Sequence, residues 1–502
     1  MGQLFQRLAG QIRSITLQYS AVMVIRARPI ARAAGGWLLL ACAGQLAACA
    51  HFQPRPLSAQ ASLEGFESRS LEAPGLRTFL RGNGLAVPAA DTAWSLQALT
   101  LTAVYYQPAL AEARARLLAA QAARITADER PNPSLSVTPG YDAIVPGAVH
   151  PWIVPLSFDW PVETAGKRGY RHAEAQHLAA AARWDLVGTV WRARSRLRAA
   201  LLGLYAAQRS ESLVEREQST RQRAVRLLAS QLTAGNVPSY EVSEARIALD
   251  RATLAKQAAI GQLQQARIAL AGALGVPLDA IAGARFSFVE LQAIPLDLTR
   301  PQVRQQALLE RADVRAALER YAASQSALQL QIARQWPDID LGPGFQWDPQ
   351  LAGDREWDLG LSLPLPIRNR NAGPIAEAKA EREVAASHFQ TVQTAAITEI
   401  DAALAGYESA RAQLMTADSL LRGLRQQLRS IDAQVAAGEL QALDQVNARL
   451  AYEDGTEDRL EALVHAQQEL GQLEDAMQSP LTLAPATVGA ADHPTNREAA
   501  IP

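Results

Sequence analysis

The segment SFDWP at residues 157–161 ends a stretch of alternating apolar and polar residues, and a turn rich in Gly, Lys and Arg leads from it to AEA at 173–175. At the same offset of 203 residues, LSLP at 361–364 is followed by an Arg- and Asn-rich turn and by AEA at 376–378. Self-similarity at a fixed spacing indicates two copies of one structural unit. The sequence therefore predicts two internal repeats, one over 91–275 and one over 301–478.

Each copy contains two stretches in which apolar residues recur at every second position, which predicts β-hairpins over 134–160 and 338–364. Each stretch is about nine or ten residues long, as a tilted strand needs to cross a bilayer. The alternative is a pair of soluble hairpins with one face on a core. Tryptophans in these strands suit an aromatic girdle at the membrane interfaces: Trp152, Trp160, Trp347 and Trp357.

After each hairpin the hydrophobic period changes from 2 to 3.6. The pattern predicts two very long helices over 169–232 and 374–437, each 64 residues or roughly 95 Å. Shorter return helices are predicted over 238–274 and 441–477. No globular domain buries helices of this length, so they must be stabilised by other long helices beside them.

The remaining segments carry weaker signals. A helical pattern begins near Asp91, breaks at Pro108 and ends before PNP at 131–133. Residues 49–90 are rich in Pro, Gly and Ser and are predicted to be extended. Residues 276–300 are predicted to be a linker crossing the outside of the helices, and 479–502 a disordered tail.

The N-terminal residues 1–48 have the pattern of an extension and a secretory signal peptide. Arginines precede the apolar run WLLLA at 37–41, and LAAC at 46–49 resembles a bacterial lipobox with Cys49 as the lipidated residue. The alternative is an ordinary signal with a chance cysteine, and Met23 is an alternative start. Ala50 follows the cysteine, so the Asp that retains lipoproteins at the inner membrane is missing. Without Cys42 and with Cys49 lipidated, the mature chain forms no disulfide.

Four membrane strands cannot satisfy their backbone groups alone, because lipid offers no hydrogen bonds and a sheet in a bilayer must close into a barrel. The smallest single-chain barrels use about eight strands. The chain is therefore expected to share its strands with copies of itself. Three copies would supply a 12-stranded β-barrel and a matching tube of 12 helical legs.

With these features taken together, the chain resembles the TolC family of outer-membrane factors over nearly all of residues 91–478. The resemblance rests on PVETAGKR at 161–168 with its counterpart near Pro364, the Ala-Gly turns at 234–235 and 437–438, and RADVRAA at 311–317. It implies a homotrimeric, TolC-like α+β membrane protein in the bacterial outer membrane, with a periplasmic α-barrel. It also implies a periplasmic adaptor and an inner-membrane pump as partners. A lipid-anchored N-terminus is typical of the branch serving resistance-nodulation-division (RND) pumps.

The same resemblance places functional residues at the two helix-to-helix turns. Gly235 and Gly438 are expected to allow the left-handed turn conformation and to form the surface that an adaptor contacts. Acidic residues near the second turn ring the closed periplasmic entrance in TolC-like channels, and Asp444 fits that pattern while Asn447 departs from it. The alternative for Asp444 is a solvated acid near a helix start. The candidate gate residues are Asp444 and Asn447 with their first-copy counterparts Glu241 and Glu244.

Several function classes are not supported by the residues. The net charge of −1 gives no reason to expect nucleic acid, the seven histidines lack zinc-like spacing, and no nucleophile constellation is present, so no catalytic residue, metal or cofactor is predicted. The expected function is a passive exit channel of a tripartite efflux system for metal cations or small organic toxicants. The alternatives are the duct of a type I protein-secretion system and a non-channel periplasmic coiled-coil scaffold lipoprotein.

Overall fold

The computed structural model describes most of the chain in two compact units, one containing residues 51–85 with Val276–Gly283 and the other containing the remaining described residues. The predicted signal peptide over 1–48 and Cys49 lie outside the described residues, as does most of the predicted tail, 482–502. The described residues are 51–85, 92–141, 143, 151–294, 310–348 and 354–481.

The smaller unit corrects the prediction that residues 49–90 are extended. It contains α3 (Ala59–Glu67), α4 (Pro74–Gly82) and the short 3-10 helix η2 (Leu278–Ile281). The Ser58 side chain caps α3 by accepting a hydrogen bond from the Ala61 N–H. Pro74 stands at the start of α4, where a helix does not need its N–H, and Leu76 and Leu80 one turn apart are fully buried. The Pro/Gly composition thus marks helix starts rather than an unstructured segment.

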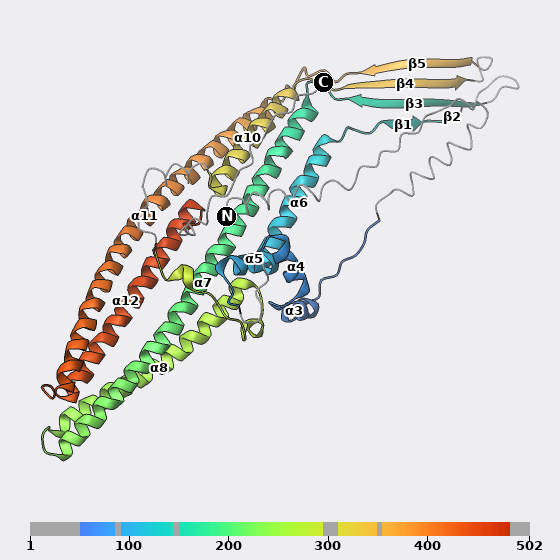
Figure 1. Cartoon of the computed structure of the whole chain (residues 1–502). Helices are drawn as coiled ribbons and strands as arrows, with labels where there is room; N and C mark the ends of the chain where they lie inside the picture. The colour runs from blue at the N-terminus through green and yellow to red at the C-terminus, as the bar shows by residue number, and fades with distance from the viewer. Residues whose placement is uncertain are drawn as a thin grey trace, which may run out of the picture. The chain divides into compact units, whose positions relative to one another are not determined.

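The larger unit is built on two long helices, α7 and α11, of 67 and 65 residues, each followed by a 36-residue helix. Figure 1 shows α7 with α8 and α11 with α12 as two long hairpins of helices. From α6 to α8 and from α10 to α12 the chain forms a helix, then strands, then a long helix and its return helix, with three described strands in the first copy and two in the second. The helices of this unit are α5 (Leu96–Tyr106), α6 (Pro108–Asp128), α7 (Lys167–Thr233), α8 (Ser239–Leu274), α10 (Ala312–Ala333), α11 (Ala372–Ala436), α12 (Ala442–Met477) and the 3-10 helix η3 (Val289–Leu291).

The helices are held together by rows of leucine and alanine. Helix α7 packs against α6, α8, α10 and α12, and α11 packs against α10 and α12. Full burial of a leucine contributes roughly 1.5–3 kcal/mol, so these rows stabilise helices that would not persist alone. The fully buried leucines of α7 and α8 are Leu197, Leu201, Leu204, Leu270 and Leu274, and a second core joins Ile400, Leu404 and Tyr407 to Leu470 and Leu473. None of the helices in the described ranges is both long and apolar enough to span a bilayer.

The strands form one antiparallel sheet in the order β1-β3-β4-β5, with β2 also paired to β3. The register pairs Trp160 with Leu341 and Phe345 with Trp357. The first strand of the sheet is interrupted between β1 and β2 at Pro139, which has no N–H for the ladder. The strands are β1 (Ser134–Val137), β2 (Gly140–Tyr141), β3 (Trp152–Val162), β4 (Ile339–Asp348) and β5 (Asp354–Ser362).

A polar junction fixes the place where β3 ends, α7 begins and β4 starts. The buried Lys167 ammonium lies 2.7 Å from the Asp338 carboxylate, which also accepts the Thr164 N–H at 2.8 Å. The Thr164 hydroxyl donates to the Pro337 carbonyl at 2.6 Å. Residues more than 170 positions apart in the sequence therefore set the angle between the sheet and the long helix.

The middle of the predicted linker over 276–300 is held in place by backbone hydrogen bonds and by a short helix. The Trp94 N–H donates to the Arg285 carbonyl at 2.8 Å, and the Ser287 N–H donates to the Trp94 carbonyl at 2.9 Å. Helix η3 follows at once, and its Leu291 is 1% exposed. Residues 295–300 lie outside the described part of the chain.

Candidate functional site

The turns at the ends of α7 and α11 have the same geometry. Gly235 and Gly438 have φ of 76° and 81°, as predicted for left-handed turn residues. The residue after each glycine donates its N–H to a carbonyl five positions back: Asn236 to Gln231 at 2.8 Å, and Glu439 to Gln434 at 2.9 Å. Glycine is favoured at the centre of such a helix ending, because a residue with a Cβ is strained at a positive φ. The turn then directs the chain into the return helix.

Asp444 lies in the first turn of α12 and caps that helix. Its Oδ2 accepts the Gln441 N–H at 2.9 Å, and the Gln441 side chain in turn accepts the backbone N–H of Asp444. This reciprocal pair is a capping box, which satisfies two donors that the helix start would otherwise leave open. The carboxylate is half-buried and near the positive end of the helix, so the helix start itself stabilises its charge.

A network of amide and charged groups connects this tip to α7. Gln231 Nε2 donates to Gln441 Oε1 at 3.3 Å, and Arg223 donates to Gln445 Oε1 at 3.0 Å. Gln445 donates onward to Asp432 at 2.8 Å. The sequence analysis missed this network, because the residues of α7 and their partners on α12 are more than 200 positions apart and each is typical of a solvated helix face. It ties the beginning of α12 to the end of α7.

The other candidate gate residues have no partners that would fix them. Glu241 is half-buried in the first turn of α8, while Glu244 and Asn447 are exposed. Within the described ranges, none of these three side chains makes a hydrogen bond or an ion pair. The structure therefore does not bring the four candidate residues together within one chain. The side chains of Glu241, Glu244 and Asn447 remain free to face another copy or the solvent.

The predicted girdle tryptophans lie near both ends of the sheet. Trp160 is close to the helices, at the end of β3, whereas Trp152 begins β3, and Trp347 lies near the distant end of β4. Trp152 stacks edge-on against Tyr141 with ring centroids 5.1 Å apart, and Trp357 lies 4.8 Å from Phe345. All four tryptophans are at least 39% exposed. Aromatic side chains at both ends of a sheet are the arrangement that two membrane interfaces favour.

The apolar side chains of the strands are not covered by the rest of the described chain. Leu359 and Leu361 of β5 are 75% and 68% exposed, and Leu135 of β1 is 62% exposed. Within the described ranges, the outer edges of β1 and β5 also have no strand partner. A soluble hairpin would bury these leucines against a core, so the alternative of a soluble hairpin on a core does not describe this sheet.

A buried group of charges joins α7 to α12 far from the tips, and the sequence analysis missed it. Arg194 Nη1 lies 3.0 Å from Glu474 Oε2, and Arg198 Nε lies 3.4 Å from the same oxygen. Arg198 also donates to the carbonyl and the side chain of Gln467, both at 2.8 Å. Burial lowers the pKa of Arg198, although Glu474 opposes that shift. These contacts offset much of the cost of burying two cations inside the helix bundle, although Arg194 Nε has no hydrogen-bond partner among the described residues.

A group of acidic residues, separate from the Arg194–Glu474 contacts, lies on the part of α12 that packs against α7. Glu453 is 8% exposed; its Oε1 accepts the Thr220 hydroxyl at 3.0 Å, while its Oε2 has no hydrogen-bond partner. Burial raises the pKa of Glu453, and the neighbouring Glu217 carboxylate adds to that shift. Burial and nearby carboxylates raise the pKa of Asp454 and Glu457 in the same way. This face of α12 therefore holds protons more tightly than free carboxylates do.

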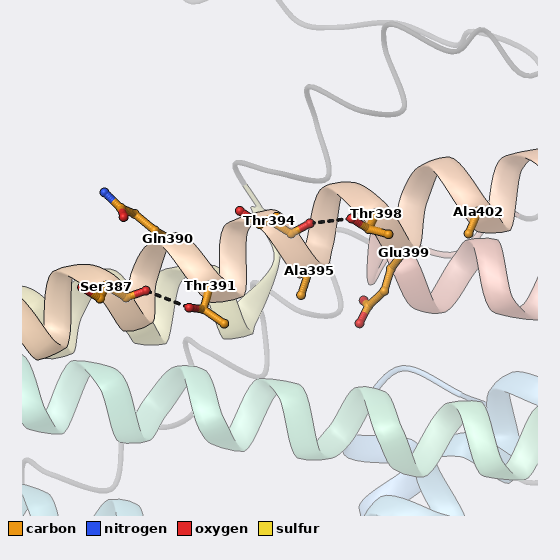
Figure 2. A pocket seen from close by; sticks show the side chains of 8 residues that line it. All are labelled: Ser387, Gln390, Thr391, Thr394, Ala395, Thr398, Glu399 and Ala402. Atoms are coloured by element: carbon orange, nitrogen blue, oxygen red, sulfur yellow. Dashed lines mark hydrogen bonds between the residues drawn. The ribbon is translucent and has the colours of Figure 1, made fainter.

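Helix α11 carries an open groove of about 830 Å³ lined mostly by small and hydroxyl-bearing side chains, together with Gln390 and Glu399. Figure 2 shows Ser387, Thr391, Thr394 and Thr398 in succession along one helix. Thr391 and Thr398 donate their hydroxyls to the carbonyls one turn back, at 2.9 and 3.0 Å. The helix backbone thus satisfies these hydroxyls, and the groove presents a low, weakly polar surface to which another helix could approach closely.

The described residues include no set of three or more His, Cys, Asp or Glu side chains arranged to hold a metal ion. The described features are instead an uncovered sheet, paired long helices and two matching tips. Residues 103–276 and 303–477 match the family described as outer membrane efflux protein. The chain belongs to the outer membrane efflux protein family. The resemblance to TolC-type channels is thereby confirmed, and the family is one of outer-membrane channels.

Known members of this family resemble the chain at low identity. The cobalt-zinc-cadmium resistance protein CzcC of Cupriavidus metallidurans is 23% identical over 290 residues, which cover 58% of this chain and 68% of CzcC. The outer membrane protein VceC of Vibrio cholerae aligns with a TM-score of 0.62 and 20% identity, over 76% of this chain and 96% of VceC. The open state of the Neisseria gonorrhoeae MtrE channel gives 0.60 and 18%, over 77% and 89%. The two structures establish the shared fold.

Proposed function

We propose that three copies of this chain form a passive outer-membrane exit channel. The observation that carries the proposal is the sheet, whose outer edges at β1 and β5 have no strand partner within the described ranges and whose apolar side chains are exposed. In lipid, open edges cost several kcal/mol for each unsatisfied backbone group, so the sheet must be completed by other strands. Three copies, each contributing four passes of the sheet, form a 12-stranded barrel that places the tryptophans at the two interfaces.

The long helices continue the barrel as a 12-helix tube in the periplasm. The groove on α11, which no other part of the described chain fills, supports packing of a neighbouring copy on this face. Cys49 carries the lipid that anchors each chain to the outer membrane. The tips at Gly235 and Gly438 dock a periplasmic adaptor, which connects the tube to an inner-membrane RND pump. The pump supplies the energy, and the channel itself has no catalytic role.

The cargo is a small toxic solute, and metal cations are the preferred class. Support comes from the similarity to CzcC, which is named for cobalt, zinc and cadmium resistance. The channel conducts the ion without holding it in a dedicated site.

The test is to purify the full chain from outer membranes and measure its mass in detergent. The expected result is a detergent-dependent trimer that forms conducting pores in planar bilayers and in which mass spectrometry finds lipid on Cys49. A Cys49→Ser variant is the matched control for the lipid. A monomer that stays in solution without detergent would refute the channel. For the cargo, cells lacking the chain should gain sensitivity to zinc, cobalt or cadmium, and unchanged tolerance to all three would exclude metal export.

A further inference from the structure

A cavity of about 740 Å³ lies at the boundary between the sheet and the helices. The strands contribute apolar residues to its lining, including Trp160 and Val162 from β3 and Leu341 from β4. The end of α6 and the beginning of α7 contribute charged and polar residues, including Arg130, Arg168 and His172. The cavity therefore has a composition that changes from apolar to cationic across the sheet–helix boundary. Its volume lies in the range of roughly 300–1,000 Å³ that is usual for small-molecule sites.

The charges around this cavity do not balance. Its two acids are already paired, since Asp128 accepts from Arg168 Nε at 3.1 Å and Glu163 pairs with Arg171. Arg130 is exposed and makes no ion pair or side-chain hydrogen bond with the described residues. An arginine is left over, and its guanidinium offers the forked donors that match a phosphate group.

Two further features lie on the same side of the cavity. The His172 ring lines the cavity and is 38% exposed, while its Nδ1 is buried and faces the Asp128 carboxylate, 3.7 Å away. No side chain caps the first turn of α7, which includes Gly169 in the cavity lining, so its backbone N–H groups add positive potential on the same side. The cavity thus combines an arginine without an ion-pair partner among the described residues and the start of a long helix with an apolar wall.

We propose that this cavity binds the phosphate-bearing headgroup of an anionic phospholipid. The inference rests on the proposed function, which puts the sheet in the outer membrane and the helices in the periplasm. The sheet–helix boundary then coincides with the headgroups of the inner leaflet. Arg130 binds the phosphate, His172 lies beside it, and Trp160, Val162 and Leu341 contact the first part of the acyl chains. Trp160, which is 56% exposed, has the interfacial position that tryptophan prefers.

The experiment compares the full chain with Arg130→Gln and with Arg116→Gln, an exposed arginine of α6 that already pairs with Glu112 at 2.5 Å. Each protein is placed in nanodiscs of phosphatidylcholine containing a minor fraction of phosphatidylglycerol, and native mass spectrometry counts the phosphatidylglycerol that remains bound. Arg130→Gln is expected to weaken retention about fivefold, since one arginine at a membrane surface contributes on that scale. Arg116→Gln is expected to match the unmodified chain.

A second arm separates a lipid headgroup from a free phosphate. Soluble glycerol phosphate should compete poorly with the lipid, because it lacks the acyl chains that contact Trp160. Equal competition would show a simple phosphate site and overturn the lipid assignment, as would equal retention by Arg130→Gln and the unmodified chain. Trimer mass and pore conductance are measured on the same samples. Trimeric pores without lipid preference refute only this inference, whereas a chain that stays out of the bilayer refutes both proposals.

Discussion

Arg194 on α7 and Glu474 on α12 lie 3.0 Å apart with both side chains only 4% exposed. The two helices belong to different halves of the chain, so this pair fixes one half against the other. Removing two charges from water is costly, and a buried pair returns that cost only when every remaining donor and acceptor is satisfied. Here Arg198, Gln467 and the Leu481 N–H supply further partners, but Arg194 Nε has none among the described residues, so the group meets this condition only in part.

Glu474→Gln is expected to destabilise the protein by about 3–5 kcal/mol, because it leaves two buried guanidinium groups facing a neutral amide. The measurement is the thermal unfolding midpoint of the purified protein in detergent. Glu461→Gln, an exposed residue of the same helix, should shift stability by no more than about 0.5 kcal/mol. Similar midpoints for both variants would mean that Glu474 is dispensable for packing.

Glu453→Gln is expected to stabilise the protein at neutral pH. Burial raises the pKa of the Glu453 carboxyl above its ordinary value of 4.5. Between pH 4.5 and the raised pKa the folded state binds more protons than the unfolded state, so this group lowers stability as the pH rises through that window. The advantage of the glutamine should be greatest at pH 7 and vanish as the pH falls towards 4.5. Unfolding midpoints at several pH values check this, with exposed Glu439→Gln as the control.

Gly438→Ala is expected to cost about 1–2 kcal/mol at the tip of α11 and α12, since a residue with a Cβ is strained at a φ of 81°. The cost comes from the backbone alone, because a Cβ at this position would meet no atom within 4 Å. Gly423→Ala, in the interior of α11 with the same open surroundings, should instead stabilise the helix by up to about 1 kcal/mol. Hydrogen exchange of the tip amides distinguishes the two variants, and equal protection would contradict the strain argument.

Two substitutions of Asp444 separate its charge from its capping role. Asp444→Ala removes both, so it should raise single-channel conductance, weaken block by multivalent cations and cost about 1 kcal/mol of helix stability. Asp444→Asn keeps an acceptor for the Gln441 N–H, which now lies 2.9 Å from Oδ2, and should weaken only the block. If cation block is unchanged in both variants, Asp444 is a capping residue outside the entrance.

Leu361→Arg is expected to impair assembly into the outer membrane, because a cation on the lipid face of a barrel costs roughly 2–4 kcal/mol at mid-depth. Leu361 pairs with Leu341 in the register and is 68% exposed in the single chain. The adjacent Ser362→Arg points to the opposite face and should be tolerated. Heat-modifiable trimer on gels reports the outcome. If the two variants assemble equally well, the face of β5 that carries Leu361 does not contact lipid.

Periodicity alone predicted the long helices closely. The helix expected over 169–232 is α7, Lys167–Thr233, and the one expected over 374–437 is α11, Ala372–Ala436. Long runs without proline and a sustained 3.6-residue pattern leave few alternatives. The left-handed conformation of Gly235 and Gly438 was also predicted correctly, because each glycine follows the last residues of a helical pattern.

The elements that were missed depend on tertiary contacts. Helix α4 is short and begins with proline, so only the burial of Leu76 and Leu80 reveals it. Arg194 and Arg198 are four residues apart on a helix and look like a solvated face, yet their partner Glu474 comes some 280 residues later in the chain. The capping role of Asp444 could have been predicted, since Gln441 stands three residues before it; its place at an entrance depends on other copies of the chain.

The edges of β1 and β5, which have no strand partner among the described residues, also bear on biogenesis. In the proposed trimer other copies complete the sheet, so a single chain would not finish folding by itself and the last step would be an encounter between molecules. The yield of mature pores should then rise steeply with the rate of export, and a lone chain left waiting should be an easy target for periplasmic proteases.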